Sequence, residues 1–186
     1  MVTAGKGPVP SPAARGTAAS VPEASALAVA AAVVDPELTM VTLADLGILR
    51  QVREDGDHVT VTITPTYSGC PAMQQIRLDL DRRLRHAGYR SVTVRTELSP
   101  PWTSDWITAQ GRQKLAAAGI APPGPAPGRP AGGPVPLRLT ASPRSVPCPH
   151  CGAPQTRETS AFGATACRAL YVCEQCREPF EHVKDI

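Results

Sequence analysis

The sequence predicts an α+β fold, a small mixed sheet with helices on one face, followed by a separate small module built around cysteines. Three observations carry this prediction. Residues 58–64 alternate apolar and polar side chains, as a half-buried strand does. Residues 71–88 carry apolar side chains at helical spacing. Two Cys-x-x-Cys pairs, at 148–151 and 173–176, lie close to the end of the chain.

The composition divides the 186 residues into four regions. Residues 1–21 are rich in Ala, Pro, Gly and Ser and are predicted to be a disordered tail, and residues 120–147 have the Pro/Gly-rich composition of a linker. Residues 22–119 are long enough to bury a core of their own. Residues 148–186 are too few for a good core, so we expect a bound metal to stabilise them.

The first half of the larger domain predicts a helix and a hairpin. A helix is expected from about Pro22, with Leu27 and Val34 on one face, until Asp35-Pro36 ends it, because a residue before proline avoids the helical region. Residues 48–53 and 58–64 form two strands around an Asp-Gly-Asp turn. The alternation directs three side chains to the core: Val59, Val61 and Ile63.

The second half of this domain predicts a helix, a strand and a last helix. The central helix begins at Pro71 and ends at Gly88. Its apolar stripe consists of Met73, Ile76, Leu80 and Leu84. Residues 91–98 alternate as a third strand, and the Pro100-Pro101 pair breaks it. A last amphipathic helix is predicted from its apolar residues Trp106, Ile107, Leu115 and Ala118.

Charge and hydropathy exclude several classes of protein. The net charge is only +3 and no Lys/Arg block occurs, which argues against nucleic acid as a partner, including for a ribbon of the transcription type. The longest apolar run, Ala26–Val34, is too short to span a bilayer, and the N-terminus lacks a signal-peptide pattern. We therefore expect a cytoplasmic protein with no membrane partner, whose paired cysteines bind metal rather than form disulfides.

The paired cysteines predict a C-terminal zinc ribbon. Four thiolates satisfy Zn²⁺ in a tetrahedral structural site. The expected ligands are Cys148, Cys151, Cys173 and Cys176. Three short strands, at 155–160, 167–172 and 179–183, would surround the two metal-binding turns. Arg168, with Arg177 and Lys184, is expected to offset the negative charge of the thiolates.

Other interpretations of this module stay open. The Cys148-Pro-His-Cys151-Gly turn also resembles that of rubredoxin, and thiolates bind iron too. An electron-transfer protein with iron in the four-cysteine site is therefore the alternative function. The fifth thiol, Cys167, is either a small strand residue packed under the ribbon or an alternate ligand for transient iron or copper. His150 and His182 are expected on the surface.

The lone thiol of the first domain, Cys70, is the candidate reactive residue. It lies just before the predicted central helix, where the helix dipole would lower its pKa. It could equally be an inert, buried cysteine. One thiol cannot hold a metal alone, so a second ligand would have to come from Asp35, Glu37 or Asp45. The alternative role of these carboxylates is helix termination and solvation.

Several motifs resemble known families. The segments 35–37, 45–48 and 64–71 resemble the domain of SufT-type proteins, which act in iron–sulfur cluster assembly. The segments 100–106 and 162–180 are similar to the PaaD (PaaJ) subunit family of the bacterial phenylacetyl-CoA 1,2-epoxidase. Because the match spans both predicted domains, it is more specific than either half alone.

This resemblance implies a role in aerobic phenylacetate breakdown. The epoxidase combines a di-iron oxygenase subunit, a structural partner and a reductase. The chain lacks the Glu-x-x-His pairs of a di-iron site and the Gly-x-Gly-x-x-Gly turn of a dinucleotide site. The resemblance therefore implies a non-catalytic accessory subunit that assists iron or iron–sulfur maturation, with the oxygenase subunit or the reductase as partner. Cys70 takes the family's reactive position, with Asp35, Glu37 and Thr66 at neighbouring motif positions.

Overall fold

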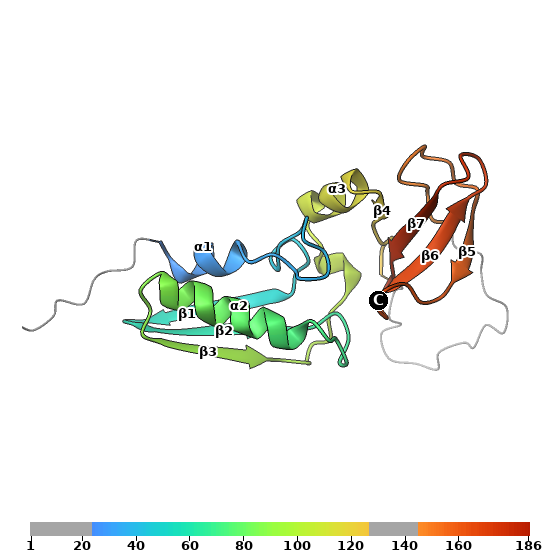
Figure 1. Ribbon diagram of the computed structural model, residues 1–186. Helices are drawn as coiled ribbons and strands as arrows, with labels where there is room; N and C mark the ends of the chain where they lie inside the picture. The colour runs from blue at the N-terminus through green and yellow to red at the C-terminus, as the bar shows by residue number, and fades with distance from the viewer. Residues whose placement is uncertain (1–23, 127–144) are drawn as a thin grey trace, which may run out of the picture.

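The computed structural model describes residues 24–126 and 145–186 (Figure 1). The predicted tail, 1–21, and most of the predicted linker lie outside these residues. The elements, in chain order, are α1 (Ala26–Ala31), β1 (Leu49–Asp55), β2 (His58–Ile63), α2 (Met73–His86), β3 (Ser91–Thr96), the 3₁₀ helix η1 (Ser104–Trp106), α3 (Ala109–Ala117), β4 (Ile120–Ala121), β5 (Thr156–Ser160), β6 (Arg168–Cys173) and β7 (Pro179–Val183).

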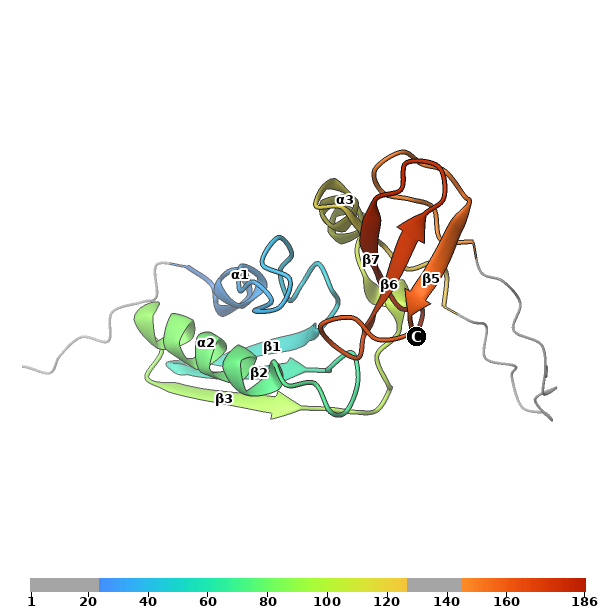
Figure 2. The same cartoon turned by 45° about the vertical axis from the view of Figure 1, so that its right-hand side comes forward.

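The first sheet is mixed, in the order β1-β2-β3, which confirms the predicted fold class. β1 and β2 pair antiparallel as the predicted hairpin. β2 and β3 pair parallel, with Val61 opposite Val94, because α2 carries the chain back across the sheet between them. The helices α1 and α2 lie together on one face of this sheet (Figures 1 and 2).

The core lies between this face and the helices. The three side chains predicted from β2, Val59, Val61 and Ile63, are completely buried. They meet the apolar stripe of α2, in which Ile76, Leu80 and Leu84 are at most 1% exposed. Each such side chain contributes about 1.5–3 kcal/mol on burial, so this layer supplies most of the cohesion of the first domain.

Two predicted helices differ from the structure. α1 ends at Ala31, and Val34 instead forms an isolated β-bridge with Thr42. Leu27 is consequently 57% exposed, and the buried face of α1 is made by Ala26 and Ala30, whose small side chains allow close packing. The predicted last helix is divided into η1 and α3 because Thr108 caps α3, its Oγ1 accepting the N–H of Gly111 at 2.9 Å.

The second sheet has the order β4-β7-β6-β5. Strands β5 to β7 are the three short strands predicted for the ribbon, and they pair antiparallel in chain order. The short strand β4 pairs parallel with β7, so Ile120 and Ala121, which the sequence places in the linker, belong to this sheet. The prediction that His182 lies on the surface was wrong. It is buried beside β4, with Nδ1 3.2 Å from the carbonyl oxygen of Ala121.

The ribbon packs directly against the first domain. Ile120 and Val183 belong to the same buried cluster as the helix–sheet core. The backbone N–H of Ser104 donates to the carbonyl oxygen of Ile186 at 2.9 Å, which attaches the C-terminus to the 3₁₀ helix. Figure 2 shows the loop before β6 reaching down to the first domain. Within 24–126 and 145–186, no helix is long and apolar enough to cross a membrane.

The close approach of α3 to the loop that contains Asp45 generates a stability prediction. A Cβ atom at Gly111 would lie 2.6 Å from the carbonyl oxygen of Asp45. Alanine has the better helix propensity by about 1 kcal/mol, but overpacking against a fixed backbone costs about 1–3 kcal/mol. We therefore expect Gly111→Ala to lower the midpoint of urea unfolding. Gln110→Ala, on the exposed side of the same helix, is the control and should change stability by less than about 0.5 kcal/mol. An unchanged or raised midpoint for Gly111→Ala would contradict the packing argument.

Candidate functional site

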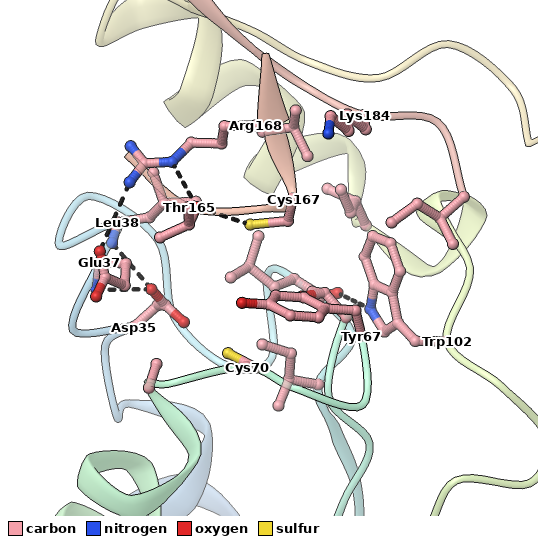
Figure 3. Close-up of a pocket in the computed structure, with 17 residues that line it drawn as sticks. Asp35, Glu37, Leu38, Tyr67, Cys70, Trp102, Thr165, Cys167, Arg168 and Lys184 are labelled. Carbon is pink, nitrogen blue, oxygen red and sulfur yellow. Dashed lines mark hydrogen bonds and ion pairs between the residues drawn. The ribbon is translucent and has the colours of Figure 1, made fainter. Parts of the chain in front are cut away.

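A small cavity lies where the two domains meet (Figure 3). The first domain contributes the polar residues Asp35, Glu37, Thr66, Tyr67 and Cys70, and the ribbon contributes Thr165, Cys167, Arg168 and Lys184. Apolar walls come from Leu38, Leu46, Ile48 and Trp102. The cavity volume is about 30 Å³. Pockets for organic ligands are usually about 300–1,000 Å³, so this space has room for no more than an ion or a small inorganic group.

Cys70 lies half-buried in the loop that leads into α2. Its backbone is held by a hydrogen bond from its N–H to the carbonyl oxygen of Tyr67, at 3.2 Å. Burial raises the pKa of the thiol, the backbone N–H of Ala72 offsets part of this, and the negative charge of Asp35 adds to it. The sequence predicted a lowered pKa. That prediction was wrong because α2 begins only at Met73, and loss of water outweighs its N-terminal field.

Asp35 uses one carboxylate oxygen to shape its own loop. Oδ1 accepts the backbone N–H groups of Glu37 and Leu38, at 2.8 and 2.9 Å. Burial raises the pKa of this carboxyl, and the two N–H groups offset part of the rise. Oδ2 has no hydrogen-bond partner among the described residues and is turned toward Cys70 (Figure 3). Asp35 therefore combines a structural role with a free oxygen beside the thiol.

The other predicted residues divide into two groups. Thr66 lines the cavity, half-buried, next to Tyr67. Glu37 lies at the rim, with its carboxylate toward Arg168 rather than Cys70. Asp45 is not part of the cavity wall. Its Oδ2 accepts hydrogen bonds from Lys114 Nζ at 2.6 Å and from the backbone N–H of Thr42 at 2.9 Å, which makes it a structural residue.

Arg168 connects the two domains electrostatically. Its side chain is only 8% exposed, and its guanidinium pairs with Glu181 of β7 and reaches Glu37 across the junction, N to O 3.6 Å. The sequence predicted that Arg168 would offset the charge of the paired cysteines. It lies instead at the start of β6, and its positive charge belongs to the cavity.

Cys167 is the cavity residue that sequence reasoning left unassigned. It precedes β6, and its Sγ lies 3.0 Å from Thr165 Oγ1, while its carbonyl oxygen accepts the N–H of Lys184 at 2.9 Å. Figure 3 shows its thiol facing the cavity from the ribbon side, with Cys70 on the other side. The available signal was a single unpaired thiol in a module whose other four cysteines are paired.

The four paired cysteines form a second cluster. Their sulfur atoms all lie within 4.8 Å of one another, and two pairs are at 3.6 and 3.7 Å. Both turns place a residue with positive φ after the second cysteine: Gly152 at 75° and Arg177 at 65°. The backbone N–H of Cys176 donates to Cys173 Sγ at 3.4 Å and lowers the pKa of Cys173 to about 6. This donor set fits a tetrahedral thiolate metal site.

Within the ribbon, Cys167 and the four-cysteine cluster are far apart. Cys167 precedes β6 and Cys173 ends it. Six residues of extended strand span about 20 Å, so Cys167 cannot substitute for a ligand of the four-cysteine cluster without unfolding β6. It belongs to the junction with the first domain.

Comparisons with known proteins match both domains. A family model described as "PaaD zinc beta ribbon domain" matches residues 133–184, and one described as "Iron-sulfur cluster assembly protein" matches residues 23–95. The chain is 40% identical over 152 residues to a protein of Escherichia coli (strain K12) whose name describes it as a subunit of 1,2-phenylacetyl-CoA epoxidase. That match covers 82% of this chain and 86% of the relative.

Solved structures overlap part of the chain. A domain of unknown function, DUF59, from Bacillus anthracis is 29% identical, with a TM-score of 0.45, and covers 48% of this chain and 87% of its own. A conserved hypothetical protein from Thermotoga maritima is 26% identical, with a TM-score of 0.44, and covers 53% of this chain and 98% of its own. The sequence matches carry the assignment: the protein belongs to the PaaD family of phenylacetyl-CoA epoxidase subunits, with an iron–sulfur cluster assembly domain followed by a zinc β-ribbon.

Proposed function

We propose that this chain is a non-catalytic accessory subunit of a phenylacetyl-CoA 1,2-epoxidase that assists iron or iron–sulfur maturation of the complex. The name of its Escherichia coli relative, a subunit of that epoxidase, supports a place in a multisubunit complex. The di-iron oxygenase subunit and the reductase are the partners that need iron. The match of residues 23–95 to iron–sulfur cluster assembly proteins supports the maturation role.

The observation that carries this proposal is the ion-sized cavity that contains Cys70 and Asp35. A volume of about 30 Å³ excludes an acyl-CoA substrate but admits a metal ion. A thiol is a ligand that iron accepts, and the raised pKa keeps Cys70 protonated at neutral pH until a cation displaces the proton. No histidine lines the cavity among the described residues, so no imidazole base is at hand to activate Cys70 as a nucleophile.

The ribbon has a separate, structural role in this proposal. Cys148, Cys151, Cys173 and Cys176 would hold Zn²⁺, which supplies no chemistry of its own there but closes the two turns of a module too small to fold by burial alone. The folded ribbon then presents β6 and its preceding loop to the first domain.

The role of Cys70 is tested by co-expressing the remaining epoxidase subunits with Cys70→Ala. We expect iron content and epoxidation of the purified complex to fall about tenfold or more, because loss of a metal-binding group weakens binding at least that much. Ser68→Ala is the matched control, since Ser68 is exposed in the same loop. Full iron loading and full activity with Cys70→Ala would refute the role assigned to this thiol.

The ribbon metal is tested by elemental analysis and by chelation. We expect colourless protein with one zinc per chain. A strong chelator should abolish amide-exchange protection in β5 to β7 while β1 to β3 remain protected, since the first domain has its own core. Cys173→Ser, which removes a buried thiol, should have the same effect as the chelator. Coloured protein with a ferric signal in electron paramagnetic resonance would favour the electron-transfer alternative instead.

A further inference from the structure

We propose that Cys167 is a second thiolate ligand for the cargo ion, so that a single divalent cation of the Fe²⁺ class binds between the two domains, to Cys70, Cys167 and Asp35. This inference rests on the proposed function and adds a role for the ribbon. The ribbon completes the metal site by donating a thiolate ligand that the first domain lacks.

The positions of the two thiols support shared binding. Both are half-buried, and both line the same cavity from opposite domains (Figure 3). The loop of Cys167 is fixed by the hydrogen bond from the N–H of Lys184 and by the contact of its Sγ with Thr165 at 3.0 Å.

A carboxylate supplies the third ligand. Asp35 is 6% exposed, its Oδ1 is occupied by two backbone N–H groups, and its Oδ2 is turned toward Cys70. Two sulfur ligands and one oxygen ligand suit borderline cations such as Fe²⁺, Co²⁺ and Zn²⁺. The fourth position would be left to water or to a group of the partner that receives the ion.

The charges around the cavity bear on what the site can hold. Two thiolates and a carboxylate carry three negative charges, and a divalent cation leaves one uncompensated. Arg168 already pairs with Glu181 and reaches Glu37, so the further positive charge at the cavity is that of Lys184. Binding would release the protons of both thiols to solvent.

The spacing of the ligands suggests a site that exchanges its ion. Among the described residues, only the four ribbon cysteines form a group of ligand atoms that all lie within 4.8 Å of one another. Cys70, Cys167 and Asp35 are therefore more widely separated than the ligands of a closed tetrahedral site, and binding must draw at least one of them inward. The cost of that movement makes this ion easier to release than the ribbon metal. The small cavity volume favours one ion over a whole cluster.

The experiment uses Co²⁺ as the probe, added without oxygen to full-length chain that already contains one zinc per molecule. Thiolate ligation of Co²⁺ produces charge-transfer absorption in the near ultraviolet, which reports the number of sulfur ligands. We expect the wild type to bind one equivalent of Co²⁺. Cys167→Ser and Cys70→Ser should each weaken binding about tenfold or more and remove about half of the charge-transfer intensity. Gln155→Ala, an exposed change in the ribbon, should bind as the wild type does.

The outcomes separate the two proposals. If Cys167→Ser binds Co²⁺ as the wild type does while Cys70→Ser does not, the shared site is refuted and the role of Cys70 stands. If the zinc-containing wild type binds no Co²⁺, both the shared site and the metal-binding role of Cys70 are refuted. Zinc content shows whether each variant is folded. Should Cys167→Ser lose its zinc, alkylation of the wild type decides instead: Co²⁺ must protect Cys70 and Cys167 together from iodoacetamide, and protection of Cys70 alone would overturn the inference.

Discussion

The position of the ribbon depends on a small set of contacts between the chain around α3 and the C-terminal strand. β4 pairs Ile120 and Ala121 with Glu181 and His182 of β7, and the N–H of Ser104 donates to the carbonyl oxygen of Ile186. α3 is itself held to the Asp45 loop, where only a glycine fits at position 111. The ribbon is thereby fixed in orientation relative to the first sheet. Since Cys167 precedes β6, the strand next to β7, that orientation decides which side of the ribbon faces Cys70.

The ribbon can hold this position only if it is folded, and its own apolar cluster is small. Tyr171 and Phe180 stack, with ring centroids 5.7 Å apart, beside the buried thiols Cys148 and Cys173. Such a cluster cannot offset the conformational entropy of about forty residues, roughly 1.5 kcal/mol each, without a further cross-link. Four thiolates around one ion would provide it. Folding of the ribbon therefore also determines where Cys167 lies, although Cys167 is about 20 Å from Cys173 along β6.

Local patterns predicted much of this structure, and long-range contacts account for what they missed. The alternation in 58–64 predicted β2, and the stripe from Met73 to Leu84 predicted α2, because a single strand or helix shows its buried face in its own sequence. β4 shows no such pattern, because a strand of two residues is too short for an alternation of apolar and polar side chains to be recognised. The burial of His182 follows from the pairing of β4 with β7, and the positions of Arg168 and Cys167 at the cavity depend on the packing of the ribbon against the first domain. The family motifs drew attention to Cys70 and Asp35, which both line the cavity, but they singled out no ribbon residue of that cavity.

The four-cysteine cluster of the ribbon and the Cys70 site at the junction differ in a way that would suit a structural metal in the first and a transferred metal in the second. In the ribbon, the sulfur atoms all lie within 4.8 Å of one another, and the backbone N–H of Cys176 lowers the pKa of Cys173. At the junction, burial favours the neutral thiol of Cys70, and an uncharged thiol can remain in an apolar cavity without a counterion. In the role that we propose, a cation displaces the proton of Cys70 when it binds, and the thiol takes up a proton again when the cation leaves. Such a site would bind metal when metal is supplied and give it up to a stronger set of ligands, as delivery to another subunit requires.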